Sequence, residues 1–103
     1  MEKEQEALEF LAGIWQKSPK AAIANTYLSL TKKHAPDNYE NAVAELLNSD
    51  PENPGGNLVQ GDILLADGKD ELAKVHYLKA LAANENLVPA LNNVAWITAK
   101  TNP

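Results

Sequence analysis

The chain contains 103 residues, 45% of them hydrophobic and 22% charged, which is the composition of an ordinary folded domain with a modest core. Its formal net charge of −5 argues against a nucleic-acid surface, because phosphate binding needs a concentrated basic face. It has no cysteine, which excludes disulfides, thiolate zinc sites and thiol catalysis, and no apolar run approaches the roughly 18 residues of a membrane span.

The first half of the chain is predicted to form three helices. Apolar residues at spacings of three and four predict a helix over residues 2–17, and Ser18–Pro19 ends it and caps the next. The second helix runs to about Lys33, residues 34–38 form a turn, and a third helix covers roughly 39–48. The side chains expected to face inward are Ala7, Leu8, Leu11, Ile14 and Trp15, then Ile23, Tyr27 and Leu30, then Val43, Leu46 and Leu47.

The second half begins at residues 50–56, where proline and glycine make the strongest break in the chain. We interpret this short break as a connection between helical hairpins within a single domain over 1–103. The following hairpin divides at Gly68, whose flexible backbone ends one helix, while Asp70 and Glu71 favour the positive start of the next. A last helix is predicted from about residue 87 to residue 100, with an inward row of Leu91, Val94, Ala95 and Thr98.

The helical pattern repeats along the chain at nearly constant intervals. Trp15, Leu47 and Leu81 are separated by 32 and 34 residues, and Gly61 and Ala95 again lie 34 apart. Such intervals indicate stacked helical repeats. Because the chain starts on a second helix, stops on a first helix and has no polar capping face there, we expect a fragment of a longer array. The predicted organisation is two hairpins at about 20–50 and 54–84, with half-repeats at both ends.

The second hairpin resembles the tetratricopeptide repeat, a helical hairpin of about 34 residues. The resemblance rests on small and aromatic residues at the positions that the family prefers, namely Gly61, Gly68, Ala73, Tyr77 and Ala80–Leu81. The hairpin departs from the family at Asn57, Gln60 and Glu85, where a bulky residue, a leucine and a proline are usual. The resemblance implies an all-α superhelix of about six antiparallel helices. Tyr27 and Tyr39 replace small residues in the first hairpin, so its helices should lie further apart.

A narrower resemblance covers two phrases in the second half of the chain. Residues 58–66 and 89–96 look like the repeats of the exosortase-associated (PEP-CTERM system) tetratricopeptide lipoproteins. That resemblance implies a role in protein sorting or exopolysaccharide export. It also implies a periplasmic or outer-membrane-associated location in a Gram-negative bacterium, with a cytoplasmic location as the alternative.

No catalytic, cofactor-binding or metal-binding constellation is found in the sequence. His34 and His76 lack a second metal ligand at helical spacing. Gly55–Gly56 has no preceding strand and no following Gly-Lys-Ser/Thr, so it is not a phosphate loop. We therefore expect a protein that is not an enzyme and needs no cofactor.

In the tetratricopeptide family, the first helix of each hairpin lines a concave groove that receives peptides or partner helices. The resemblance therefore implies a non-catalytic scaffold for a protein or peptide partner. Repeat register assigns nine residues to the groove: Asn25, Leu28, Lys32, Val59, Asp62, Leu65, Asn92, Asn93 and Trp96. Trp96 is the best anchor candidate, because large amphipathic rings dominate many interfaces. It could alternatively pack against a following helix.

Other functions stay open at this point. The carboxylate clamp of the co-chaperone members is not expected, because Ala24 and Leu28 stand where it needs lysine and asparagine. The chain could instead be a structural spacer or a segment that self-associates through exposed terminal helices. A third possibility is a regulatory segment of an enzyme encoded elsewhere in a longer chain.

Overall fold

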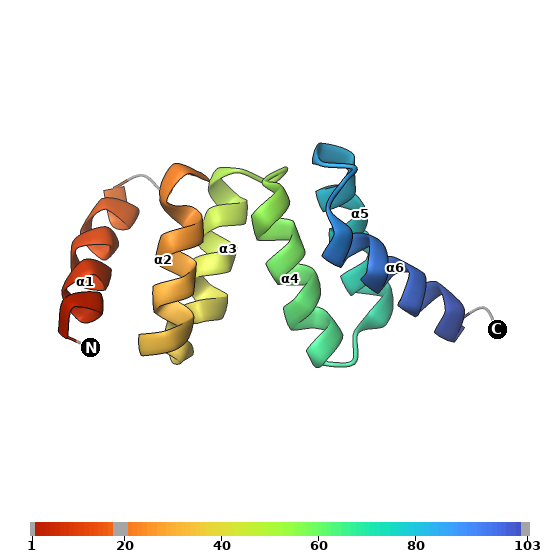
Figure 1. The fold of residues 1–103 in the computed structure, drawn as a ribbon, viewed down its shortest axis with the longest axis horizontal. Coiled ribbons are helices and arrows are strands. Elements are labelled where there is room, and N and C mark those ends of the chain that lie inside the picture. The colour runs from red at the N-terminus through yellow and green to blue at the C-terminus, as the bar shows by residue number, and fades with distance from the viewer. Residues whose placement is uncertain (1, 18–20, 102–103) are drawn as a thin grey trace. The chain divides into compact units, whose positions relative to one another are not determined.

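The computed structural model describes residues 2–17 and 21–101, and every regular element in this part of the chain is helical. Six helices follow one another along this part of the chain, and consecutive helices pack antiparallel within residues 2–49 and within residues 54–101 (Figure 1). The elements are α1 (Glu2–Lys17), α2 (Ala21–His34), the 3-10 turn η1 (Pro36–Asn38), α3 (Tyr39–Ser49), α4 (Pro54–Ala66), α5 (Asp70–Ala83) and α6 (Val88–Thr101). The all-α class is confirmed. The tetratricopeptide superhelix stays a prediction, and the Ser18–Pro19 cap lies outside the described residues.

The chain divides into two compact units, residues 1–50 and 51–103. The boundary falls where proline and glycine make the strongest break in the sequence. The first unit holds α1, α2 and α3, and the second holds α4, α5 and α6. Each unit buries hydrophobic side chains of its own helices.

The first unit buries aromatic and aliphatic side chains from the predicted inward faces. Trp15 is fully buried and its ring stacks on that of Tyr27, with 4.4 Å between the ring centroids. Val43 and Leu46 on α3 are fully buried as well. Ile14 is 39% exposed, although the apolar stripe predicts that it faces inward. Ala7 is exposed as well, so the buried side of α1 is narrower than the predicted stripe and runs through Leu8, Leu11 and Trp15.

An ion-pair cluster ties the start of α1 to the end of α2. The Glu4 Oε1 atom lies 2.8 Å from Lys33 Nζ and 3.3 Å from His34 Nε2. The hydrogen bond from Lys33, and then that from His34, lower the pKa of the Glu4 carboxyl. The basic run at the end of α2 therefore pairs with a carboxylate in addition to complementing the helix dipole.

The turn between α4 and α5 has the geometry that Gly68 predicts. Gly68 has a φ of +77°, in the left-handed region that favours glycine. The Gly68 N–H donates to the Leu65 carbonyl at 3.0 Å, and the Lys69 N–H donates to the Leu64 carbonyl at 2.9 Å. These two bonds form a Schellman motif, which satisfies the last carbonyls of α4.

The α4–α5 pair packs closely because a glycine faces a tyrosine. A Cβ atom placed on Gly61 would lie 2.6 Å from Cε1 of the Tyr77 ring. The ring that lies against Gly61 is that of Tyr77 on α5. Both Ala73 and Tyr77 are fully buried. In the first unit, Tyr27 stacks on Trp15 of α1, so the wider spacing of α2 and α3 expected from Tyr27 and Tyr39 stays a prediction.

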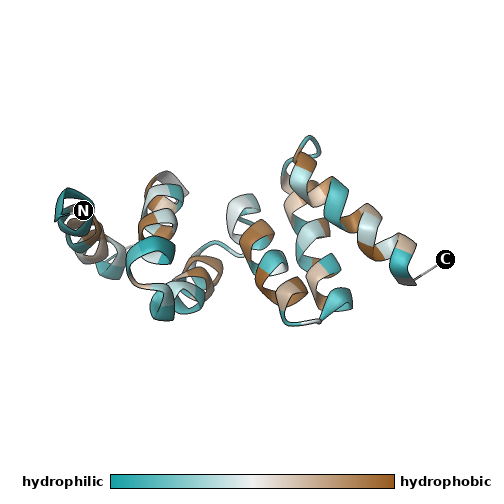
Figure 2. Cartoon of the chain, turned by 60° about the horizontal axis from the view of Figure 1, so that its bottom comes forward, coloured by the Kyte–Doolittle hydropathy of each residue, from teal (hydrophilic) through white to brown (hydrophobic). Residues whose placement is uncertain are grey.

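Helix α6 packs against α5 with a different row from the predicted one. Ala90 and Ile97 are fully buried and join Ala73 and Tyr77 in the core of the second unit. Leu91, by contrast, is 46% exposed, and Ala95 is exposed as well. The predicted inward row was therefore partly wrong. Apolar residues occur on several sides of α6 (Figure 2), so periodicity alone does not identify the side that meets α5.

Candidate interaction surface on the second unit

Three of the nine predicted groove residues lie on α2 in the first unit. Asn25 and Lys32 are exposed there, and the Lys32 ammonium lies 5.7 Å from the centroid of the Tyr39 ring. Leu28 is only 6% exposed, so little of its side chain is available to a partner. Their assignment to a groove stays a prediction.

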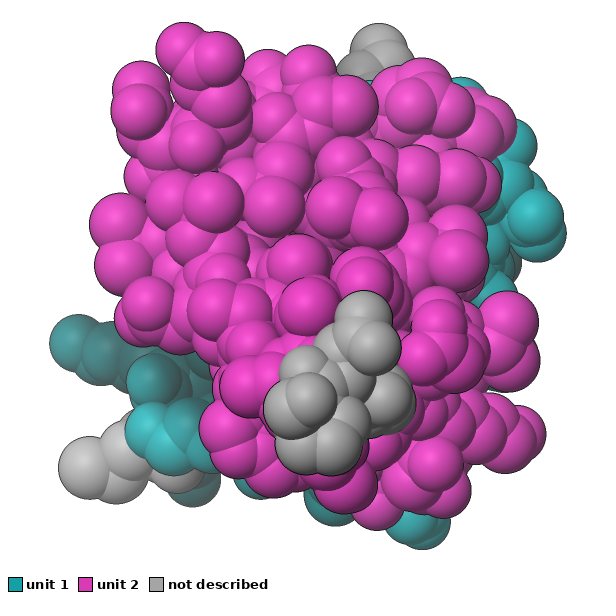
Figure 3. All heavy atoms as spheres, turned by 90° about the vertical axis from the view of Figure 1, so that its right-hand side faces the viewer, with its two compact units in different colours: residues 1–50 teal, residues 51–103 magenta. Residues whose placement is uncertain are grey.

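The other six lie on α4 and α6 in the second unit. Val59 and Leu65 are partly buried, and Leu65 packs against the core cluster of this unit. The exposed members are Asp62, Asn92 and Trp96, while Asn93 is partly buried. Figure 3 shows side chains of this unit closely packed on the side turned to the viewer.

Asp62 and Asn93 are brought into contact by the fold, although they are 31 residues apart on different helices. The Asn93 Nδ2 group donates to Asp62 Oδ1 at 3.4 Å. The Tyr77 hydroxyl donates to the same Oδ1 atom at 2.6 Å. Burial, and then the hydrogen bond to Asp62, raise the pKa of the Tyr77 hydroxyl above its usual range. Tyr77 therefore stays a neutral donor and holds one carboxylate oxygen in place.

Trp96 follows Asn93 by three residues, so both lie on one side of α6. Its side chain is 54% exposed, and the Lys100 ammonium lies 4.9 Å from the centroid of its ring. Lys100 also pairs with Asp70 at the start of α5, with 2.9 Å between Nζ and Oδ2. We call Asp62, Asn93 and Trp96 the α4–α6 surface. It combines an oriented carboxylate with an exposed indole ring.

Comparison of the chain with protein-family models, curated proteins and solved structures gave no match. The family resemblance therefore rests on the residues of the chain alone. No helix in residues 2–17 and 21–101 is long and apolar enough to cross a membrane.

Sequence reasoning missed two contributors to the α4–α6 surface. Tyr77 stands at a position where the tetratricopeptide family prefers an aromatic residue, and its hydroxyl donates a hydrogen bond to Asp62. The signal was the pairing of Gly61 with Asp62, because a small residue lets the ring approach the neighbouring carboxylate. It also read Asp70 only as a helix-start charge, whereas this carboxylate fixes Lys100 beside Trp96.

A second polar cluster in this unit is structural. Asn57 is 1% exposed, and its Nδ2 group donates to the carbonyls of Pro51 and Asn53 at 3.0 Å each. Its Oδ1 atom lies 2.9 Å from His76 Nδ1. Burial, and then the charge of Lys79, lower the pKa of His76. The neutral ring therefore carries its proton on Nδ1 to satisfy the asparagine.

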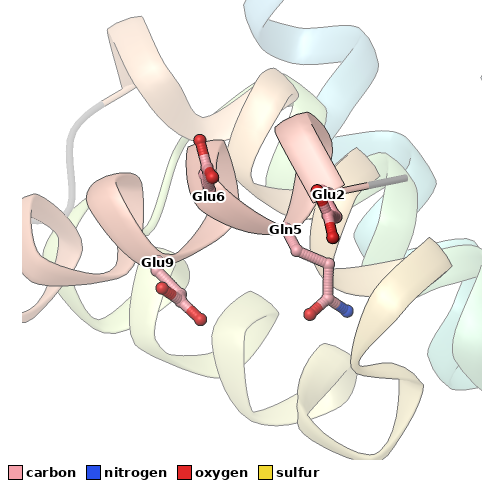
Figure 4. Close-up of a pocket in the computed structure, with 4 residues that line it drawn as sticks. All are labelled: Glu2, Gln5, Glu6 and Glu9. Atoms are coloured by element: carbon pink, nitrogen blue, oxygen red, sulfur yellow. The ribbon is translucent and has the colours of Figure 1, made fainter.

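An open pocket on α1 is lined by four polar side chains of one helix face, Glu2, Gln5, Glu6 and Glu9 (Figure 4). Figure 4 shows the carboxylates of Glu6 and Glu9 pointing apart, which is unsuited to a shared cation. Among the described residues, no group of three or more His, Cys, Asp and Glu side chains could hold a metal ion.

Proposed function

We propose that this chain is a non-catalytic interaction module of tetratricopeptide type that binds a partner peptide or helix on the α4–α6 surface. One observation carries the proposal: repeat register assigned Asp62 and Asn93, which lie on two different helices, to one groove, and the two side chains make contact. The exposed Trp96 lies one helical turn further along α6. A fixed polar pair beside an exposed indole supplies both orientation and apolar contact area for a peptide.

The biological setting of the proposal comes from sequence resemblance. The phrases at 58–66 and 89–96 resemble exosortase-associated tetratricopeptide lipoproteins. We therefore place the partner in protein sorting or exopolysaccharide export, in the periplasm or at the outer membrane of a Gram-negative bacterium. The partner itself is defined here only by the surface that it would contact.

The test uses peptides selected from a random display library on the immobilised chain. Their dissociation constants are then measured with the natural chain, Trp96→Ala and Leu72→Ala. The two substituted side chains are 54% and 55% exposed, so both variants should keep the natural circular-dichroism spectrum. Trp96→Ala should weaken binding at least about tenfold, as loss of an interface anchor does, and Leu72→Ala should not. Equal affinities for all three proteins would contradict the proposal.

A second candidate function is a spacer or self-association segment. It is favoured by large apolar side chains that stand exposed on α5 and α6: Leu72, Val75, Leu78, Val88 and Leu91. Exposed apolar side chains of this kind often contact other proteins or further copies of the same chain when they form one patch. Sedimentation velocity of the natural chain and of a Leu91→Lys variant tests this candidate.

A further inference from the structure

We infer that the partner presents an arginine to the α4–α6 surface, with its guanidinium paired to Asp62 beside the Trp96 ring. This inference rests on the proposed function and adds the chemistry of the ligand. It starts from the unequal use of the two Asp62 oxygens. Oδ1 accepts hydrogen bonds from Tyr77 and Asn93, whereas no described residue bonds Oδ2. The carboxylate is thus held in one orientation, and its Oδ2 atom can accept a hydrogen bond from a ligand.

The negative charge of Asp62 has no counter-charge paired with it among the described residues. Among the described residues, the ion pairs join Lys33 and His34 to Glu4, and Lys100 to Asp70, and none involves Asp62. Tyr77 and Asn93 are neutral donors, so they orient the carboxylate without cancelling its charge. The chain as a whole carries a net charge of −5. A cationic ligand therefore complements both the residue and its surroundings.

The neighbouring Trp96 ring already holds a cation in the free protein. Lys100 lies 4.9 Å from its centroid while pairing with Asp70 at 2.9 Å. This carboxylate–cation–indole arrangement shows which chemistry the surface accommodates. Asp62 offers the surface a second carboxylate, bonded to Asn93, which lies one helical turn before Trp96 on the same side of α6.

Arginine fits this arrangement better than lysine. A guanidinium is planar, so one edge can donate to a carboxylate while its face lies on an aromatic ring. An ammonium is a compact, strongly hydrated charge that makes these two contacts less well together. All nine basic residues of the chain are lysines, so an arginine at Asp62 must come from a partner.

The experiment titrates the full chain with four capped peptides of sequence Ala-Leu-X-Leu-Ala, in which X is arginine, lysine, citrulline or glutamate. Binding is followed by ¹H–¹⁵N correlation spectra. The Trp96 indole and the Asn93 side-chain amide report on the surface, and the fully buried Trp15 indole is the reference. The arginine peptide should shift both reporter signals. Citrulline, which lacks the charge, should bind about tenfold more weakly, as loss of one charge-assisted hydrogen bond does.

Asp62→Asn should lower the affinity for the arginine peptide by a similar factor, while Asp67→Asn should leave that affinity unchanged. Each variant removes one exposed carboxylate: Asp62 lies in the C-terminal half of α4, and Asp67 is the C-cap of the same helix. The amide oxygen introduced by Asp62→Asn can still accept from Tyr77, so the fold is kept. Equal binding of arginine, lysine and citrulline peptides would overturn the inference, as would equal losses in the two variants.

The outcomes also separate this inference from the proposed function. If citrulline or glutamate peptides shift the Trp96 indole as strongly as the arginine peptide, the surface binds peptides but does not select arginine. The inference then fails while the proposed function stands. If no peptide shifts the Trp96 indole, both fail.

Discussion

Tyr77 acts through both ends of its side chain. Its ring lies 2.6 Å from the position that a Gly61 Cβ would take, and its hydroxyl donates to Asp62 on the surface. A single side chain therefore sets the spacing of α4 and α5 and the orientation of the candidate carboxylate. Gly61 is required for both, because any larger residue displaces the ring.

Replacing Gly61 with leucine should lower the free energy of unfolding by about 1–3 kcal/mol through overpacking. The physical cause is the 2.6 Å separation between a Gly61 Cβ and the Tyr77 ring. Gly13→Ala is the control, because a Cβ at Gly13 meets nothing within 4 Å. That change should raise stability by about 0.5–1 kcal/mol, since alanine favours a helix interior. Urea unfolding measures both variants, and equal effects would show that Gly61 and Tyr77 do not constrain each other.

His76 should make the protein less stable in mild acid. Its pKa is lowered in the folded protein, so the unfolded chain binds more protons there, and stability is lost as pH falls through the unfolded value, about 6.5. His76→Gln should lose less stability between about pH 7.5 and pH 5.5. The lowered pKa of Glu4 changes stability only at lower pH, near the ordinary carboxyl range, so it does not affect the comparison of the natural chain with His76→Gln. Parallel stability curves for the two proteins would contradict this prediction.

At the scale of elements, glycine, proline and helical periodicity predict the helices well. Helix α4 begins at Pro54, as the break at 50–56 indicates, and ends just before the Gly68 turn. Asn53 caps it, since its Oδ1 atom accepts from the Gly56 N–H at 2.7 Å. These signals are local, so the sequence alone contains them.

The Gly68 turn gives a prediction at this scale. Gly68→Ala should lower the free energy of unfolding by about 1 kcal/mol, because a φ of +77° is strained for a residue with a Cβ. A Cβ there meets no atom within 4 Å, so the cost is conformational rather than steric. Gly68→Asn should restore part of the loss, since asparagine tolerates this region. Equal thermal midpoints for the natural chain and Gly68→Ala would rule this explanation out.

Packing partners were harder to predict than helices. By repeat register, Leu91 and Ala95 on α6 correspond to Asn57 and Gly61 on α4. Asn57 and Gly61 face α5, the helix that follows α4. On α6 this row is therefore exposed, while the offset row of Ala90 and Ile97 meets the preceding helix. The role of Asn57 was equally hidden, because its three hydrogen-bond partners come from the preceding loop and from α5.

At the scale of the whole molecule, the candidate surface was predicted only in part. Register assigned positions on α4 and α6 to one groove, and two of them, Asp62 and Asn93, make contact. It could not reveal the Tyr77 hydroxyl or the Asp70–Lys100 pair, since both depend on side-chain geometry across helices. It also placed Leu28 among the partner residues, although this side chain is almost fully buried.

The exposed apolar residues of α5 and α6 predict self-association at high concentration. Leu91→Lys should reduce it, because a charge at an apolar contact must be desolvated. Asn92→Lys adds the same charge at a neighbouring exposed position and should have little effect. Sedimentation velocity across a concentration series measures both. A natural chain that is strictly monomeric, with a fully protected α6 in hydrogen exchange, would remove the self-association candidate.

The placement of the two tryptophans has an optical consequence. Trp15 is fully enclosed in the first unit, whereas Trp96 is largely exposed in the second. Their emission maxima should therefore differ in wavelength, and iodide should quench Trp96 more than Trp15. The natural chain thus carries a separate fluorescent reporter in each unit. During heating, quencher-resistant and quencher-sensitive emission can be followed side by side. Two transition midpoints would mean that the units melt independently, and one shared midpoint would mean that they melt as a single cooperative block.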